Sequence, residues 1–221
     1  MSESYVEESR LTLAEASLGP LLSGGAWHPT LPSGVKPRQI GDDLWSSAFD
    51  KDQLDDRPLY WQRLALSRSL RELGAGSSDL LEFELASRGM LGNQFSAGAT
   101  YRVLVTGFDP FHLDDHIEQG NPSGVVALQH QHKQIALGAE RAEIRSMIFP
   151  VRYKDFDDFL VERVLETFTD RVDMVITVSM GRTGFDLERF PGRRRSVSTP
   201  DNVRQAGGGS AEKPFIPPHL K

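Results

Sequence analysis

The chain has 221 residues, enough for one ordinary domain with an extension or for two small domains. Its hydrophobic content of 38% and charged content of 25% are typical of a globular protein and exclude a disordered chain. The net charge of -6 argues against a dedicated nucleic-acid binder, and the lack of cysteine excludes disulfides, zinc–thiolate sites and a cysteine nucleophile within this chain. The start, "MSESYVEESR", has no signal-peptide pattern, and no apolar run reaches the roughly 18 to 20 residues that span a bilayer. We therefore expect a cytoplasmic protein that binds neither nucleic acid nor membrane.

Residues 1–98 are expected to form a helical, partly irregular extension. A short helix is predicted in "LTLAEASLGPLLSGG", ending at Gly19 and Pro20, and the stretch 25–41 is expected to be irregular because it is rich in proline and glycine. "DDRPLYWQRLALSRSLREL" predicts a helix with Pro58 in its first turn and leucines along one face, and "GAGSSDLLEFELASRGM" predicts another. These helices carry little core of their own, so they must pack on another part of the chain.

From residue 99 onward the pattern changes to alternating strands and helices. Strands are predicted in "YRVLVTGF", "AEIRSMIFPV" and "VDMVITVSM", the third of them continuous and apolar as a central parallel strand should be. A helix is expected after Pro122, and "KDFDDFLVERVLETFTD" predicts one amphipathic helix between the last two strands. The fold class is therefore α/β, with a partial, doubly wound, mostly parallel sheet (an α/β/α sandwich) and an N-terminal helical extension. Three strands make an unusually small sheet, which therefore looks unfinished.

The sequence "TGFDPF", followed by "NPS", is the first candidate for a functional site. It lies beyond the carboxyl end of the first strand, where open α/β sheets bind ligands. Phe108 and Phe111 are three residues apart in a loop and can hold a small flat ring between them. The alternative is that both rings cap the core under the helices.

The segment after the third strand, "SMGRTGFDLERF", brings Arg182, Asp186 and Glu188 to the same edge of the sheet. A carboxylate at this edge can orient a histidine, as the third member of a nucleophile–base–orienter triad does, or it can form a surface ion pair with an arginine.

The run "PGRRR" predicts a solvated arm or a subunit contact, so a homo-oligomer is among the expected assemblies. The groups "HLDDH" and "HQH" lack the helical spacing of a metal motif, and no phosphate-binding loop is present, so we expect neither a metal nor a cofactor.

Taken together, these motifs resemble type I pyroglutamyl peptidases, cysteine peptidases that remove an amino-terminal pyroglutamate. "VLVTGFDPF" is similar to the opening strand and loop of that family, "NPS" follows as it does there, and "FPVRYKDF" is similar to the second strand and its turn. "GR", "ER" and "PDN" fall at the spacing of the family. The similarity extends over residues 101–202, so residues 99–221 are interpreted as the amino-terminal half of such an α/β domain.

The resemblance implies a role for particular residues. Phe108 and Phe111 would line the pocket for the flat pyroglutamyl lactam, and Asn121, Asp201 and Asn202 would help to bind the substrate. Glu188 would be the triad acid that orients the catalytic histidine in a Cys-His-Glu mechanism. The cysteine and histidine of the family lie in the second half of the domain, and no cysteine occurs here.

Three readings follow. In the first, a complementary chain supplies the missing strands, cysteine and histidine, and the pair removes amino-terminal pyroglutamate from peptides. In the second, the chain is a non-catalytic relative that acts as a binding or interaction module. In the third, which no spacing supports specifically, the chain is an enzyme with different chemistry that uses Asp109, Asp186 or Glu188 as acid and base.

Overall fold

The computed structural model describes residues 4–22, 25–49, 55–181, 184–190, 192, 194–195 and 199–217. The N-terminal region holds α1 (Ser4–Glu8), α2 (Leu11–Leu18), the 3-10 helix η1 (Gly19–Leu21), α3 (Pro37–Phe49), α4 (Arg57–Glu72) and α5 (Ser77–Ala86). Among the described residues, no helix is both long and apolar enough to cross a bilayer.

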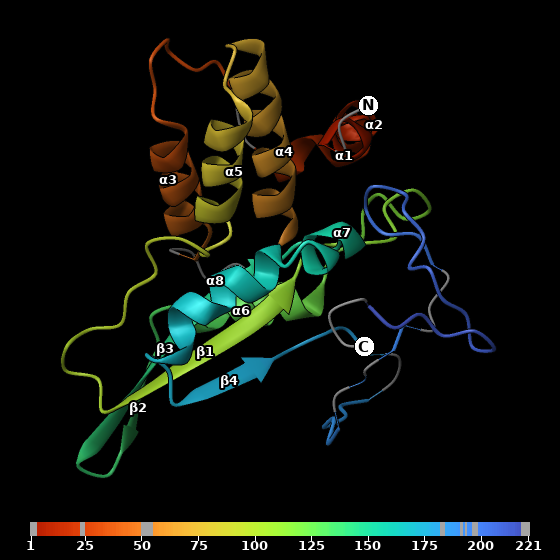
Figure 1. Cartoon of the computed structure of the whole chain (residues 1–221). Coiled ribbons are helices and arrows are strands. Elements are labelled where there is room, and N and C mark those ends of the chain that lie inside the picture. The colour runs from red at the N-terminus through yellow and green to blue at the C-terminus, as the bar shows by residue number, and fades with distance from the viewer. Residues whose placement is uncertain are drawn as a thin grey trace.

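Helices α3, α4 and α5 stand side by side above the α/β layer (Figure 1). Residues 25–36 form turns and irregular chain, as expected. The expectation was wrong for residues 37–41, because α3 begins at Pro37 and continues through Gly41. Gly41 is required there: a Cβ at this position would lie 2.6 Å from the carbonyl oxygen of Phe83 on α5. The proline thus begins the helix, and the glycine allows α3 to pack closely against α5.

The N-terminal helices pack on the α/β region, as expected. Leu44, Leu59 and Leu70 from α3 and α4 form one buried cluster with Leu128 of helix α6 and Ile148 of the sheet. The helical region and the sheet therefore share a core, and at roughly 25 cal/mol per Å² of apolar surface this shared burial stabilises both.

The α/β region consists of β1 (Tyr101–Phe108), α6 (Pro122–His130), β2 (Gln134–Leu137), β3 (Glu140–Phe149), α7 (Tyr153–Asp157), α8 (Leu160–Thr169) and β4 (Met174–Thr177). The strand order is β2-β3-β1-β4, with β1 parallel to β3 and to β4, and β2 antiparallel to β3. The structure is thus a mixed α/β fold with a mostly parallel open sheet and an N-terminal helical region. Strand β2 adds to the strands expected from the sequence.

Helices cover both faces of the sheet. Met147 and Ile148 are neighbours in β3, so their side chains point to opposite faces. Ile148 packs with Leu128 of α6 and the N-terminal helices, whereas Met147 packs with Val164 and Phe168 of α8. Helix α6 and helix α8 therefore lie on opposite faces, which is the doubly wound arrangement.

The outer edge of β3 is closed by groups from three parts of the chain. Strand β2 pairs with its first residues. Further along, Ser146 donates its N–H to the side chain of Gln131 and accepts a hydrogen bond from Asn93, and Ile148 donates its N–H to the carbonyl oxygen of Arg88. The N-terminal region thus satisfies backbone groups that a bare edge strand would expose.

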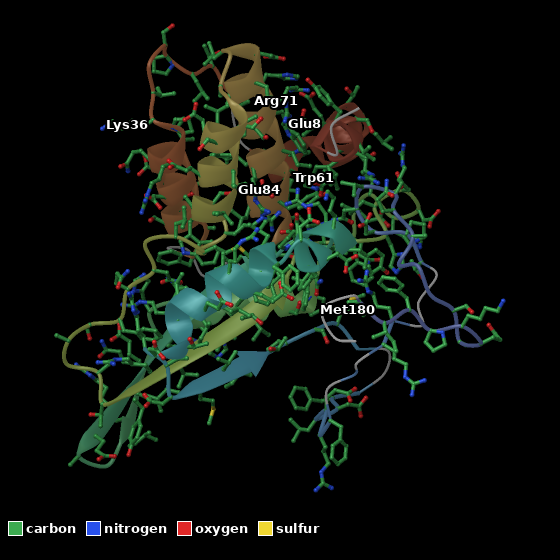
Figure 2. The ribbon with its side chains drawn as sticks, in the orientation of Figure 1. Glu8, Lys36, Trp61, Arg71, Glu84 and Met180 are labelled. Carbon is green, nitrogen blue, oxygen red and sulfur yellow. The ribbon has the colours of Figure 1, made fainter. Side chains whose placement is uncertain are left out.

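The opposite edge, β4, is open. Its residues are exposed, including Met174 at 55%, Val175 at 48% and Ile176 at 42%. This finding corrects the expectation that the third apolar segment forms a central strand: β4 pairs with β1 on one side, and the described part of the chain places no strand on its other side. In Figure 1, β4 forms the lower edge of the sheet, and Figure 2 labels Met180 on the chain that leaves it.

The helix predicted between the last two strands is interrupted. Phe159 has φ 61° and ψ 22°, a left-handed conformation that separates α7 from α8. Val164 and Phe168, beyond the break, pack on the sheet as the periodicity predicts. Phe156, before the break, packs against the same cluster and contacts Phe108, the last residue of β1, and Phe149 of β3.

The open edge predicts self-association. Replacing Val175 with lysine places a charge on β4 and opposes strand pairing with a second copy, while the exposure of this side chain leaves the fold intact. Light scattering at increasing concentration should show a lower average mass for Val175→Lys than for the unaltered chain. Leu81→Lys, at a residue 44% exposed on α5, is the matched control and should not change the mass. Equal masses for the unaltered chain and Val175→Lys would refute association through this edge.

Candidate functional site: an aromatic pocket at the carboxyl edge of the sheet

A cavity of about 270 Å³ lies at the carboxyl ends of β1 and β3. Its aromatic walls are Phe108 at the end of β1, Phe111 in the following loop, and Tyr153 and Phe156 of α7. The remaining lining residues are His112, Pro150, Val151, Arg152, Thr199, Pro200 and Asp201. We call this cavity the ring pocket. Its size is at the lower end of ligand sites, so it suits a small ring.

The structure brings together three of the residues that the sequence predicts. Phe108, Phe111 and Asp201 all line the ring pocket, although Asp201 is far from the other two in the sequence. Phe108 also stacks on Phe156 with ring centroids 6.5 Å apart and packs edge-on against Phe149 at 5.7 Å. The two readings of the phenylalanine pair are therefore compatible: Phe108 contacts the core and also lines a pocket.

Asp201 and Asn202 hold the walls of the ring pocket together. The carboxylate of Asp201 accepts main-chain hydrogen bonds from Tyr153 at 2.8 Å, Val203 at 3.0 Å and Gln205 at 2.9 Å. Asn202 donates its main-chain N–H to Val151 and its side-chain N–H to the carbonyl oxygen of Pro110 at 2.8 Å. Both side chains are buried and their polar atoms are hydrogen-bonded to the main chain, so they position the pocket walls rather than offer free polar atoms to a ligand.

Asn121 is the N-cap of α6 and fixes the loop after β1. Its side-chain oxygen accepts hydrogen bonds from the N–H and hydroxyl of Ser123, and its amide donates to the carbonyl oxygen of Asp109 at 2.9 Å. The Ser123 hydroxyl in turn accepts the N–H of Phe108 at 3.0 Å. This network gives a physical reason for the pairing of "NPS" with "GFDPF". Gly107 completes the junction, because a Cβ there would lie 2.2 Å from the carbonyl oxygen of Ser123.

Asp109 is buried between two arginines from the N-terminal helices. It is 2% exposed and lies 3.0 Å from Arg63 of α4 and 2.6 Å from Arg88, just after α5. Arg88 also pairs with Glu84 of α5 at 2.8 Å. Burial alone would raise the pKa of Glu84, but Arg88 and Arg152 outweigh it and hold this pKa well below its usual range. With both oxygens in ion pairs, Asp109 is not placed to accept a proton from a ligand, so it does not support the third reading.

Arg152, in the wall of the ring pocket, continues this ion network. It contacts Glu84 and Asp155 at 2.6 Å each and Glu7 of α1 at 3.2 Å. Burial would lower the pKa of Arg152, but these carboxylates outweigh it and raise the pKa well above its usual value. Figure 2 labels Glu84 at the end of α5 that meets the α/β layer. Two N-terminal helices, α1 and α5, thereby contribute charged partners to Arg152 in the wall of the pocket.

Arg10, after α1, joins two segments beside the pocket. It donates to both oxygens of Asp114 at 2.9 and 2.8 Å and to the carbonyl oxygen of Asn202 at 2.7 Å. Arg204 also pairs with Asp114 at 2.8 Å. Within "HLDDH", Asp114 therefore forms ion pairs with two arginines in this structure.

Asp56, at the start of α4, meets the other side of the "NPS" turn. It is 2% exposed and accepts the main-chain N–H of Asn121 at 3.0 Å. Burial raises the pKa of Asp56 to about 7, with Asp109 acting in the same direction. The protonated form of this carboxyl is therefore favoured in the folded chain only below about pH 7.

The structure does not bring Glu188 to the ring pocket. Glu188 and Asp186 are exposed in irregular chain after β4, in a segment where Phe185 is 86% and Phe190 82% exposed. The role of Glu188 as a triad acid stays a prediction, and Arg182, its predicted neighbour, lies outside the described residues.

Arg195, the last of the arginine run, is engaged within the chain. Its guanidinium lies 5.0 Å from the ring centre of Tyr153 and 4.9 Å from that of Phe215, and it pairs with Asp157. This residue is therefore not part of a solvated arm, whereas Arg193 and Pro191 lie outside the described residues.

Sequence reasoning missed the residues that the N-terminal region contributes. Arg63, Arg88 and Glu84 fall on predicted helices, where a charged residue is usually part of a solvated face. Glu7 lies before the first predicted helix, in the polar start of the chain. A weak signal was available for Arg63, since it lies between the buried Trp61 and Leu64 in the sequence.

The fold and this pocket define a class: an α/β protein with an aromatic pocket at the carboxyl edge of a parallel sheet. Residues 102–216 match the domain family described as "PA0049, C-terminal domain", and the chain belongs to this family. The chain is also 33% identical over 191 aligned residues to the "Uncharacterized protein PA0049" of Pseudomonas aeruginosa. That match covers 69% of this chain and 34% of the relative, so the chain spans about a third of the relative's length.

The match to the relative covers more of the chain than residues 102–221 hold, so it includes part of the N-terminal helical region. No solved structure matches the chain. Neither the name of the family nor that of the relative states an activity, so the relationship to pyroglutamyl peptidases stays a prediction.

The buried pairing of Asp109 predicts a large loss of stability in Asp109→Asn. This change leaves Arg63 and Arg88 without their shared counter-charge in the interior and should lower the free energy of unfolding by about 3–5 kcal/mol. Denaturant titration measures the loss. Asp115→Asn, at an exposed residue of the same loop, is the control and should stay within about 0.5 kcal/mol. Equal losses of stability in the two variants would show that the buried ion pairs of Asp109 do not stabilise the fold more than an exposed charge does.

The raised pKa of Asp56 predicts that this residue lowers the stability of the folded chain as the pH rises. Because the folded-state pKa is about 7 and the reference value is 3.8, the free energy of unfolding should fall as pH rises from about 4 to about 7. Asp56→Asn keeps the hydrogen-bond acceptor without the charge. It should match the unaltered chain at pH 4 and exceed its stability at pH 8, by at most about 4 kcal/mol. Thermal melts at both pH values test this, with Asp55→Asn as control; a variant less stable at pH 8 would contradict the assignment.

Proposed function

We propose that this chain is a pyroglutamyl-peptidase-like protein that recognises an amino-terminal pyroglutamyl group in the ring pocket. The observation that carries the proposal is the pocket itself: Phe108 and Phe111, singled out with "TGFDPF", line a small cavity at the strand ends where α/β sheets bind ligands. A five-membered lactam is a thin plate with an apolar body, and aromatic faces bury such a plate well.

Removal of the pyroglutamyl group by the family's chemistry requires a cysteine, which does not occur in these 221 residues. In the proposed reaction a cysteine thiolate bonds to the carbonyl carbon of the pyroglutamyl residue, and the peptide amine leaves with a proton from a histidine. Water then releases pyroglutamate and restores the thiol. Glu188 would orient that histidine. In this proposal a complementary chain supplies the cysteine and histidine, and the open apolar edge of β4 supports such a partner because it can accept a further strand.

A second function, a non-catalytic binding module, is favoured by the absence of cysteine and by the exposure of Glu188. In this function the ring pocket binds a pyroglutamyl peptide or a similar small lactam without cleaving it. A fluorogenic pyroglutamyl amide distinguishes the two functions. Release of the fluorophore by the native preparation, abolished by a thiol-alkylating reagent, supports cleavage with a complementary chain. Binding without release supports the module.

Phe111→Ala tests the ring pocket. Removing this wall should weaken the binding of pyroglutamyl-alanine at least about tenfold, because burying an aromatic side chain contributes about 1.5–3 kcal/mol. Isothermal titration measures the affinity. Phe95→Ala, at a phenylalanine that packs beside Arg145 and not in the pocket, is the matched control and should bind normally. If pyroglutamyl-alanine does not bind the unaltered chain, or binds equally well after Phe111→Ala, the proposed function fails.

A further inference from the structure

The ring pocket has few polar groups left for a ligand. Arg152 uses its three nitrogens on Glu7, Glu84 and Asp155, and the carboxylate of Asp201 accepts three main-chain N–H groups. The hydroxyl of Tyr153 donates to the main-chain oxygen of Thr199 at 3.0 Å. Among the lining residues, the imidazole of His112 and the hydroxyl of Thr199 make no hydrogen bond within the described part of the chain.

His112 is held in an unusual position at the mouth of this pocket. Its φ of 61° is in the left-handed region, which costs a residue with a side chain some backbone strain and would suit glycine. Its ring lies 4.4 Å from the ring centre of Phe111, tilted by 44°, and the residue is exposed. The imidazole therefore stands beside an aromatic wall with its nitrogens open to an incoming molecule.

We propose that His112 is the specificity-determining residue of the ring pocket and that, with Thr199, it selects small cyclic amides over hydrocarbon rings of the same size. A neutral imidazole has one donor and one acceptor, and a hydroxyl has both. These groups match the N–H and carbonyl oxygen of a lactam, while the aromatic walls take up its apolar body. This inference rests on the proposed function and names the residue that sets its selectivity.

The selectivity is measured as a ratio of two affinities. Pyroglutamyl-alanine and cyclopentanecarbonyl-alanine present five-membered rings of similar size, and the second lacks the ring amide. Isothermal titration of the unaltered chain should give at least about tenfold tighter binding of pyroglutamyl-alanine, because a site that hydrogen-bonds a polar group rejects the analogue without it. His112→Gly should bring the ratio close to one, and Thr199→Val should lower it.

The controls separate selectivity from folding. His112→Gly relieves the positive φ, so its melting temperature should equal or exceed that of the unaltered chain, and a lost preference then reflects the missing imidazole. His116→Gly, at another exposed histidine of the same loop that does not line the pocket, should keep the full ratio.

The outcomes are distinct. If the unaltered chain prefers pyroglutamyl-alanine and His112→Gly keeps that preference, the inference is overturned and the proposed function stands. If the unaltered chain has no preference, or binds tetramethylammonium more tightly than either ring, the pocket is an aromatic site of another kind and both proposals fail.

Discussion

The buried carboxylate of Asp109 imposes the constraint on which the rest of the structure depends. A charge at 2% exposure is stable only when it is paired, and its partners, Arg63 of α4 and Arg88 just after α5, come from the N-terminal region. The loop after β1 therefore cannot take its conformation without the helical region. The same network reaches Arg152 in the wall of the ring pocket through Glu84. The helical extension is thus part of the pocket's framework.

The pocket owes its character to this framework. Asp201 and Asn202 use their polar atoms to join the walls, and Arg152 uses its own on the ion network. Without these internal contacts, the same polar groups would be free to bind a charged or strongly polar ligand. What remains toward the cavity is mainly aromatic surface, with His112 and Thr199 as the polar exceptions. A site of this kind favours a neutral, flat molecule with a short polar edge. The proposed lactam ligand has this shape and polarity.

Much of the fold could be predicted from the sequence. The apolar residues of β1, β3 and α4 follow the spacing of a strand or a helix, and this spacing can be recognised within a short stretch of sequence. Phe108, Phe111 and Asp201 were also placed near one site by their motifs. Helix α3 was missed because Pro37 and Gly41 usually interrupt helices, and here they begin one and allow close packing. The position of β4 was wrong because an apolar run indicates burial without revealing how many strands flank it. The pairing of Arg63 with Asp109 joins residues far apart in the sequence, and no local pattern encodes it.

The two edges of the sheet separate the proposed recognition of a ligand from the proposed cleavage. The ring pocket is walled by β1, α7 and residues 199–201, beside the edge that the N-terminal region closes. Glu188 lies beyond the open strand, in water, where an ion pair or hydrogen bond contributes only about 0–1 kcal/mol and orients a histidine poorly. A strand added to β4 would exclude water from this side and strengthen such a contact. Ligand binding therefore depends on groups already in place, whereas the proposed cleavage depends on what covers β4.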